Sequence, residues 1–193
     1  AHAVGQPPPS DEVPSLDARF PDHSRVCATT KAISPSGSTM TIRVAPKVHL
    51  KPVDLINFGA ISEEMMDYLE VKTKEGANIL ISGTTGSGKT TLLRVISSFI
   101  GRSERVITCE DTQELYIDLP NFIPREAPRR VKGYDLSDLV FVTLRDLPDR
   151  IMVGEIRTAR AAMAFLEAIN TGHRGCASTL HANSAKDAIR RIQ

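Results

Sequence analysis

The chain has 193 residues, of which 41% are hydrophobic and 24% are charged, close to the average of globular proteins. This length predicts one domain and part of another, with enough residues to bury a core. Lys and Arg total 24 and Asp and Glu total 23, so the net charge of +1 gives no overall attraction to nucleic acid or anionic lipid. The chain has no Trp and only 5% aromatic residues, which argues against a stacking surface for single strands.

The cysteines, the apolar runs and the N-terminal residues indicate the cellular compartment. Cys27, Cys109 and Cys176 lie far apart and form no CxxC motif, which argues against a disulfide framework and for a reducing compartment. No apolar run approaches the length of a membrane span, and the N-terminal residues lack the pattern of a signal peptide. We therefore expect a cytoplasmic protein.

The N-terminal residues divide into a proline-rich part and a β-rich part. Pro7-Pro8-Pro9 cannot lie inside a helix or a central strand, so residues 1–24 are predicted to form a flexible tail. Segments 25–33 and 39–45 are β-branched and are separated by a Ser/Pro/Gly loop, which predicts a β-hairpin. Residues 25–50 are thus expected to be a partial, β-containing N-terminal domain.

Residues 51–76 are expected to be a linker followed by a helix that Ser62 caps. From residue 77 onward, short apolar segments alternate with amphipathic ones. The predicted strands are 79–82, 106–109, 151–154 and 176–180, and the predicted helices are 89–100, 135–145, 158–170 and a segment after Ser184. This alternation predicts an α/β fold over 77–193, with a mostly parallel sheet and helices on both faces.

A phosphate-loop motif follows the first of these strands. Gly83-Thr84-Thr85-Gly86-Ser87-Gly88-Lys89-Thr90 fits G-x-x-x-x-G-K-[ST], and Thr91 comes next. The glycines let backbone N–H groups surround phosphates, Lys89 supplies charge at the outer phosphates, and the Thr90 hydroxyl is placed for Mg²⁺. All of these residues are predicted to bind ATP.

Carboxylates follow two of the strands. Glu155 comes after strand 151–154, with Gly154 where the usual aspartate of such a strand stands, so the contact to Mg²⁺ falls to Glu155, through water. The alternative for Glu155 is a surface residue that caps the next helix. Glu110, Asp111 and Glu114 follow strand 106–109 and could orient the attacking water and order the Mg²⁺ shell; the alternative is a solvated acidic turn.

Histidines and arginines add further candidates. His173 and His181 flank a strand and lie too far apart along it to share a metal, while His181 could bond the terminal phosphate; the alternative is a structural histidine. Candidates for neutralising the γ-phosphate charge are Arg25, Arg43, Arg145 and Arg157, each otherwise a surface residue.

Taken together, four motifs resemble the secretion traffic ATPases, which power type II and type IV secretion, conjugation, type IV pili and archaeal flagella. GTTGSGKTT is similar to their Walker A motif, TCEDTQEL to the Asp box, LRDLPDRIMVGEIR to Walker B and TGHRGCASTLHANSA to the His box. EDTQEL and the hairpin ending TIR resemble the type IV secretion, conjugation and Tad branch. The second arginine that this branch often carries before Walker B is missing from Arg145-Asp146-Leu147-Pro148-Asp149.

The resemblance implies a RecA-like core, C-terminally incomplete here, and roles for individual residues. Lys89 and Thr90 would hold phosphates and Mg²⁺, and Glu110, Glu114 and Glu155 would be the catalytic acids. His173, Arg145 and Arg157 would couple nucleotide state to movement, while Arg25 and Arg43 would close over the nucleotide. It also implies a homohexameric ring at the inner face of the cytoplasmic membrane and membrane platform proteins as partners.

The function expected from these features is an ATP-hydrolysing motor subunit that powers secretion, conjugation or pilus assembly. A DNA-translocating RecA-like ATPase is one alternative, but the near-neutral charge gives it little support and no direct nucleic-acid binding is expected. A catalytically idle nucleotide-binding fragment is the other alternative.

Overall fold

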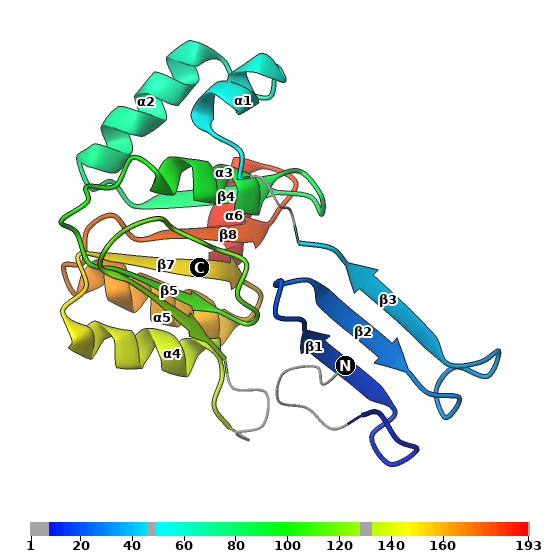
Figure 1. Cartoon of the computed structure of the whole chain (residues 1–193). Helices are drawn as coiled ribbons and strands as arrows, with labels where there is room; N and C mark the ends of the chain where they lie inside the picture. The colour runs from blue at the N-terminus through cyan, green and yellow to red at the C-terminus, as the bar shows by residue number, and fades with distance from the viewer. Residues whose placement is uncertain (1–7, 46–48, 128–132, 193) are drawn as a thin grey trace. The chain divides into compact units, whose positions relative to one another are not determined.

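The computed structural model describes residues 8–45, 49–127 and 133–192 (Figure 1). The chain divides into two compact units, Ala1–His49 and Leu50–Gln193.

The N-terminal unit holds an antiparallel sheet of three strands in the order β1-β2-β3. Strands β2 (Arg25–Thr29) and β3 (Thr39–Arg43) form the predicted hairpin. Strand β1 (Ser15–Arg19) lies within residues 1–24, so the expectation of a flexible tail is wrong for this part. Leu16 and Ala18 alternate with polar residues here, and this short period-2 pattern pairs with β2 in full register.

One face of this sheet is apolar and the other is mostly polar, as the register shows, since residues opposite each other share a face. Leu16, Ala28 and Met40 form one apolar row, and Ala18, Val26 and Ile42 form the next. Arg19, Arg25 and Arg43 form a row on the opposite face. Met40 and Ile42 therefore lie on the face opposite Arg43, although Met40 is 66% and Ile42 49% exposed.

The C-terminal unit begins with two helices, α1 (Pro52–Asn57) and α2 (Glu63–Lys74). The hydroxyl of Ser62 accepts a hydrogen bond from the amide of Met65 at 3.2 Å, so Ser62 caps α2 as predicted. Helix α1 lies in the segment predicted to be linker, because its six residues are too few to show a periodic pattern. Both helices pack on the next helix through a small cluster that includes Leu55, Met66 and Val95.

A five-stranded parallel sheet forms the centre of this unit, in the order β4-β8-β7-β5-β6. Its strands are β4 (Ile79–Gly83), β5 (Val106–Glu110), β6 (Phe122–Glu126), β7 (Arg150–Ile156) and β8 (Ala177–His181). The predicted parallel sheet is confirmed. Sequence analysis missed β6 because it contains Pro124, which a strand tolerates at the edge of a sheet.

Helices cover both faces of this sheet (Figure 1). Helix α3 (Lys89–Ser97) packs on the face that includes Met152, whereas α4 (Leu136–Thr143) and α5 (Ala159–Asn170) pack on the face that includes Ile151 and Val153. This follows from the alternation of side chains along β7. A short 3₁₀ turn, η1 (Leu144–Asp146), follows α4, and α6 (Ala185–Ile192) ends the described chain. Within the part of the chain that the structure describes, no helix is long and apolar enough to cross a membrane.

Candidate functional site

The phosphate loop joins β4 to α3, as the motif requires. Gly86 and Gly88 have φ angles of 75° and 87°, in the left-handed region that glycine adopts without strain. A Cβ atom on Gly83 would lie 2.6 Å from the hydroxyl of Ser87, so the loop closes tightly on its first residue. The predicted strand, turn and helix are therefore all in place around the motif.

Lys89 is nearly buried, at 8% exposure, and its amine lies against the loop. Nζ donates a hydrogen bond to the carbonyl oxygen of Thr84 at 2.8 Å and lies 3.4 Å from Nδ1 of His181. An ammonium group has three donors, so Nζ of Lys89 can exchange these partners for phosphate oxygens.

His181 is the last residue of β8, the strand that lies between β4 and β7. It pairs in register with Gly83, the first residue of the phosphate loop. Its Nε2 lies 2.6 Å from Oε1 of Glu155, while its Nδ1 faces Lys89. A neutral ring that donates from Nε2 and accepts at Nδ1 satisfies both contacts.

Glu155 lies on β7 just after a register shift. Val153 pairs with Ser178 but Glu155 pairs with Thr179, so Gly154 is an extra residue of the β-bulge kind, and its carbonyl accepts a hydrogen bond from the Thr179 hydroxyl at 2.8 Å. The Glu155 side chain is 18% exposed. Helix α5 is capped by Thr158, so Glu155 does not cap that helix.

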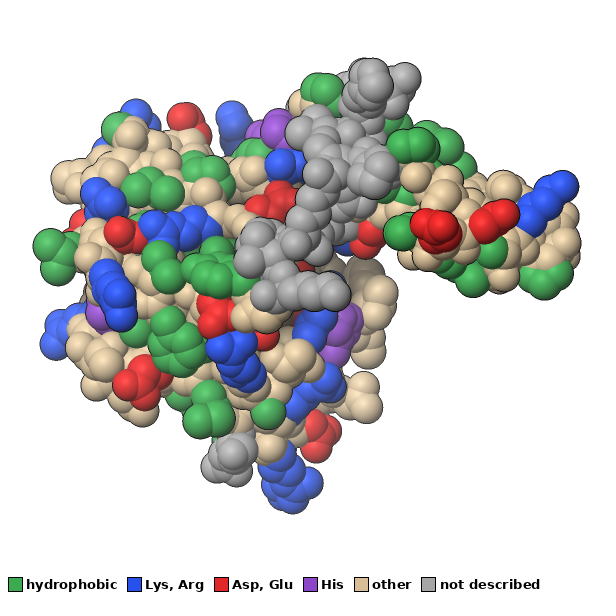
Figure 2. All heavy atoms as spheres, turned by 90° about the horizontal axis from the view of Figure 1, so that it is seen from below, with side chains coloured by type: hydrophobic (Ala, Val, Ile, Leu, Met, Phe, Trp, Pro, Cys, Tyr) green, Lys and Arg blue, Asp and Glu red, His purple; other side chains and the backbone are tan. Residues whose placement is uncertain are grey.

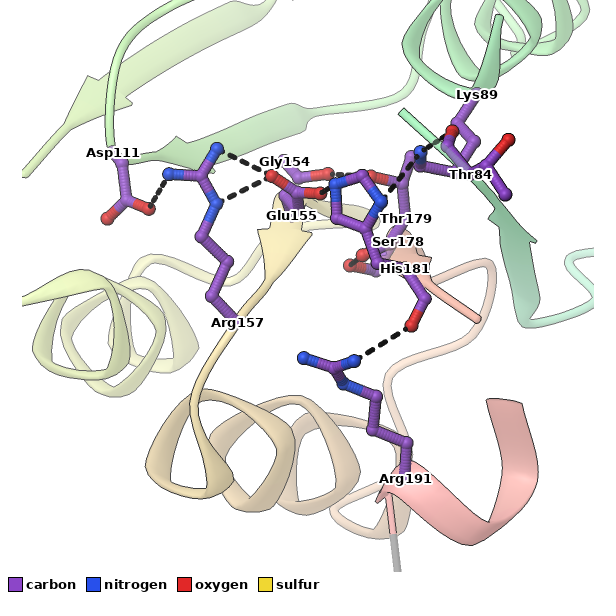
Figure 3. A network of polar contacts seen from close by, with 10 residues as sticks. All are labelled: Thr84, Lys89, Asp111, Gly154, Glu155, Arg157, Ser178, Thr179, His181 and Arg191. Atoms are coloured by element: carbon purple, nitrogen blue, oxygen red, sulfur yellow. Dashed lines mark hydrogen bonds and ion pairs between the residues drawn. The ribbon is translucent and has the colours of Figure 1, made fainter. Parts of the chain in front are cut away.

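Arg157 extends this network toward β5. Its Nε and Nη2 both lie 2.6 Å from Oε2 of Glu155, and its Nη1 lies 3.7 Å from Asp111. Figure 3 shows a continuous row of side chains, in which His181 links Lys89 to Glu155 and Arg157 links Glu155 to Asp111. The row crosses the carboxyl edge of the sheet, where open α/β folds bind ligands.

Glu110, at the end of β5, is 3% exposed and is no part of a solvated turn. Its Oε1 accepts hydrogen bonds from the amides of Glu114 and Leu115, at 2.9 and 3.0 Å. Burial raises the pKa of Glu110 to about 8, against the opposing effect of these two amides.

Glu114 is half-buried in the turn after β5, and its amide donates a hydrogen bond to Glu110. Its backbone carbonyl accepts a hydrogen bond from Nη2 of Arg94 at 2.5 Å. Arg94 lies on α3, the helix that starts at the phosphate loop, and sequence analysis did not select it. The signal available was a single arginine among the apolar residues at 92–96 of the predicted helix. Arg191 was also missed; it donates to the carbonyl of His181 at 3.1 Å.

Arg145 and His173 lie apart from this network within the C-terminal unit. Arg145 is exposed in η1, and its side chain makes no hydrogen bond or ion pair to the residues that the structure describes. His173 has a local contact, with Nδ1 3.2 Å from the hydroxyl of Thr171. Arg25 and Arg43 face each other in the N-terminal unit, and their contact with nucleotide stays a prediction.

The residues present fit a Mg²⁺ ion that arrives with nucleotide. Thr90, in the first turn of α3, and Glu155 offer the oxygen ligands that Mg²⁺ prefers. Over residues 8–45, 49–127 and 133–192, no group of three or more His, Cys, Asp or Glu side chains could hold a metal by itself. The ion would therefore depend on phosphate oxygens and water, and both Glu155 oxygens already contact His181 or Arg157, which fits a contact through water.

Comparison with known proteins agrees with this geometry. The family described as "Type II/IV secretion system protein" matches residues 10–193. The chain belongs to this family. It is 45% identical to an uncharacterized protein of Methanocaldococcus jannaschii, over 91% of this chain and 25% of the relative. It is 33% identical to the conjugal transfer protein TrbB of Rhizobium radiobacter, over 100% of this chain and 59% of TrbB.

Among solved structures, the pilus retraction motor PilT with bound ADP superposes with a TM-score of 0.74. The two sequences are 26% identical, over 94% of this chain and 52% of that chain. The RecA-like core predicted from the motifs is thus confirmed. The chain spans 25% of the length of the Methanocaldococcus relative and 59% of TrbB.

Proposed function

We propose that this chain is the nucleotide-hydrolysing part of a motor subunit that powers secretion, conjugation or pilus assembly. The observation that carries the proposal is the His181 ring, which contacts both the phosphate-loop lysine and the carboxylate of Glu155. Because His181 contacts both residues, a phosphate that binds Lys89 can change the position or hydrogen bonding of Glu155.

The chemistry assigned to these residues is phosphoryl transfer from ATP to water. Backbone N–H groups of the loop and Lys89 bind the phosphates, and the Thr90 hydroxyl would hold Mg²⁺, which neutralises phosphate charge when bound. Glu155 and Glu114 are the carboxylates that orient water at the edge of the sheet. When Lys89 turns to the phosphates, His181 loses one of its two partners, and its contact with Glu155 can change.

Assembly and location are proposed from the family. A homohexameric ring at the inner face of the cytoplasmic membrane, with platform proteins of that membrane as partners, suits a motor that moves an exported substrate. Arg25 and Arg43 are proposed to reach the nucleotide phosphates, and the row that they form includes Arg19, which sequence analysis did not select.

Phosphate release from ATP tests this function directly. The chain is incubated with ATP, with and without Mg²⁺, and with double-stranded DNA added in a third sample. We expect Mg²⁺-dependent turnover that DNA leaves unchanged. No turnover in any sample would overturn the proposal.

A nucleotide-binding fragment without turnover is the second candidate, because the chain spans only part of its relatives. Binding of ATP without phosphate release would favour it. The DNA-translocating alternative would be favoured by turnover that rises with DNA. On the face drawn in Figure 2, basic and acidic side chains are interspersed, which suits a protein that does not hold DNA there.

A further inference from the structure

Glu110 is the most deeply buried carboxyl group of the candidate site. At 3% exposure it has almost no surface with which to contact nucleotide or the attacking water. A catalytic residue must touch the reacting atoms or their water. Its hydrogen bonds go instead to the turn that carries Glu114.

The turn needs such an acceptor. Leu115 is completely buried, so its amide cannot bond to water, and the amide of Glu114 beside it is directed at the same oxygen. A buried N–H group without a partner is destabilising, so removing this acceptor favours a different path for the chain. On the other side of Glu114, its carbonyl is held by Arg94. The backbone of Glu114 is thus fixed from both β5 and α3.

Gly154 supplies the space that Glu110 occupies. A Cβ atom at position 154 would lie 3.0 Å from Cγ and 3.4 Å from Cβ of Glu110, closer than ordinary contacts. Gly154 has no positive φ angle, so the need for glycine here arises from this contact and not from the backbone. This accounts for a glycine at the position where the phosphate-loop fold usually has an aspartate.

We propose that Glu110 is a positioning residue, which fits into the space left by Gly154 and fixes the backbone of Glu114 for its part in hydrolysis. The proposal rests on the proposed function, since it assigns Glu114 a role in turnover. It departs from the expectation that Glu110 is itself a catalytic acid.

The first experiment compares Glu110→Ala with Glu110→Gln. Glutamine keeps the length of the side chain and an oxygen that can accept both amides, whereas alanine removes the acceptor. We expect kcat to fall at least about tenfold in Glu110→Ala with KM for ATP within about twofold of the parent, and Glu110→Gln to recover most of that loss. Glu167→Gln, on the exposed side of α5, is the matched surface control.

Hydrogen exchange supplies a readout that does not depend on turnover. The amides of Glu114 and Leu115 should exchange slowly in the parent and in Glu110→Gln, and faster in Glu110→Ala. If the parent hydrolyses no ATP, the proposed function fails, but these amides still test the contact. Loss of activity in Glu110→Gln equal to that in Glu110→Ala, with both amides still protected, would overturn the proposal and make Glu110 a catalytic acid.

The second experiment is a double-mutant cycle with Gly154→Ala. In the parent background, the added methyl group should displace the Glu110 side chain and lower kcat at least about fivefold. In the Glu110→Ala background, the same methyl group meets no Cγ atom and should change kcat by less than about twofold. Equal effects in both backgrounds would show that Gly154 acts on Glu155 or the strand alone, and would overturn the pairing of Gly154 with Glu110.

Discussion

Nε2 of His181 lies 2.6 Å from Oε1 of Glu155, although the two residues are separated by a strand, a helix and two loops in the sequence. The contact arises because β8 and β7 are neighbours and both end at the same edge of the sheet. Since His181 also faces Lys89, it is the only described residue that the structure places in polar contact with both.

His181→Ala should therefore separate binding from turnover. The variant keeps the loop and Lys89, so we expect ATP affinity within about threefold of the parent. We expect kcat to fall at least about tenfold, because Glu155 loses the group that contacts Lys89. Nucleotide titration and phosphate release measure the two effects. An unchanged kcat would show that the contacts of His181 with Lys89 and Glu155 have no part in turnover.

Lys89→Ala should abolish ATP turnover and strongly weaken ATP binding. The reason is that Lys89 is the one full positive charge that the loop motif provides for the outer phosphates. Titration with ATP and a phosphate-release assay check the result, with Lys186→Ala on the exposed side of α6 as the control. Turnover at the parental rate in Lys89→Ala would contradict the assignment of the loop.

Glu155→Gln should leave ATP binding largely intact and reduce hydrolysis by a factor of about a hundred or more, as expected for loss of a catalytic group. Glutamine keeps the shape but loses the charge that pairs with Arg157. The comparison of Kd for ATP with kcat decides the matter. If Kd for ATP rises as much as kcat falls, Glu155 maintains the structure of the carboxyl edge of the sheet and does not act in hydrolysis.

Arg43→Ala should weaken ATP binding about tenfold and ADP binding less, because the proposed contact is mainly to the γ-phosphate. Arg25→Ala is the parallel test, since Arg25 lies opposite Arg43. Both nucleotides are titrated against the parent and each variant. Small and equal changes for ATP and ADP would leave the hairpin without a role at the phosphates.

The free energy of unfolding should depend on pH through Glu110. Its pKa is raised to about 8 in the folded protein from an ordinary value of 4.5, chiefly by burial. Between these two pH values the folded state holds a proton that the unfolded state has lost. Stability should therefore decrease as pH rises from 4.5 to about 8, by at most about 1.4 kcal/mol per pH unit from this group.

Urea denaturation of the parent and of Glu110→Gln, at several values between pH 5 and 8, measures this effect. Glutamine does not titrate, so its curve should be flatter than that of the parent. Parallel curves for the two proteins would show that Glu110 titrates alike in both states.

Sequence patterns were enough to predict the α/β core, the phosphate loop and the parts of the site that occur as motifs. Local signals were sufficient there: Gly86 and Gly88 mark a turn with positive φ, Ser62 marks a helix start, and apolar runs mark buried strands. Sequence patterns failed for β1 and β6, because prolines near or within these segments outweighed weak strand patterns that only pairing with a neighbour stabilises.

Which of the candidate residues contact one another depends on the tertiary fold. The order β4-β8-β7-β5 places His181 between the phosphate loop and Glu155, and strand order is a long-range property that no local pattern encodes. The need for glycine at position 154 is also a long-range property, because it arises from the contact with Glu110 on another strand. Burial, which separates Glu110 from the more exposed Glu114, likewise depends on what the rest of the chain packs around each carboxyl group.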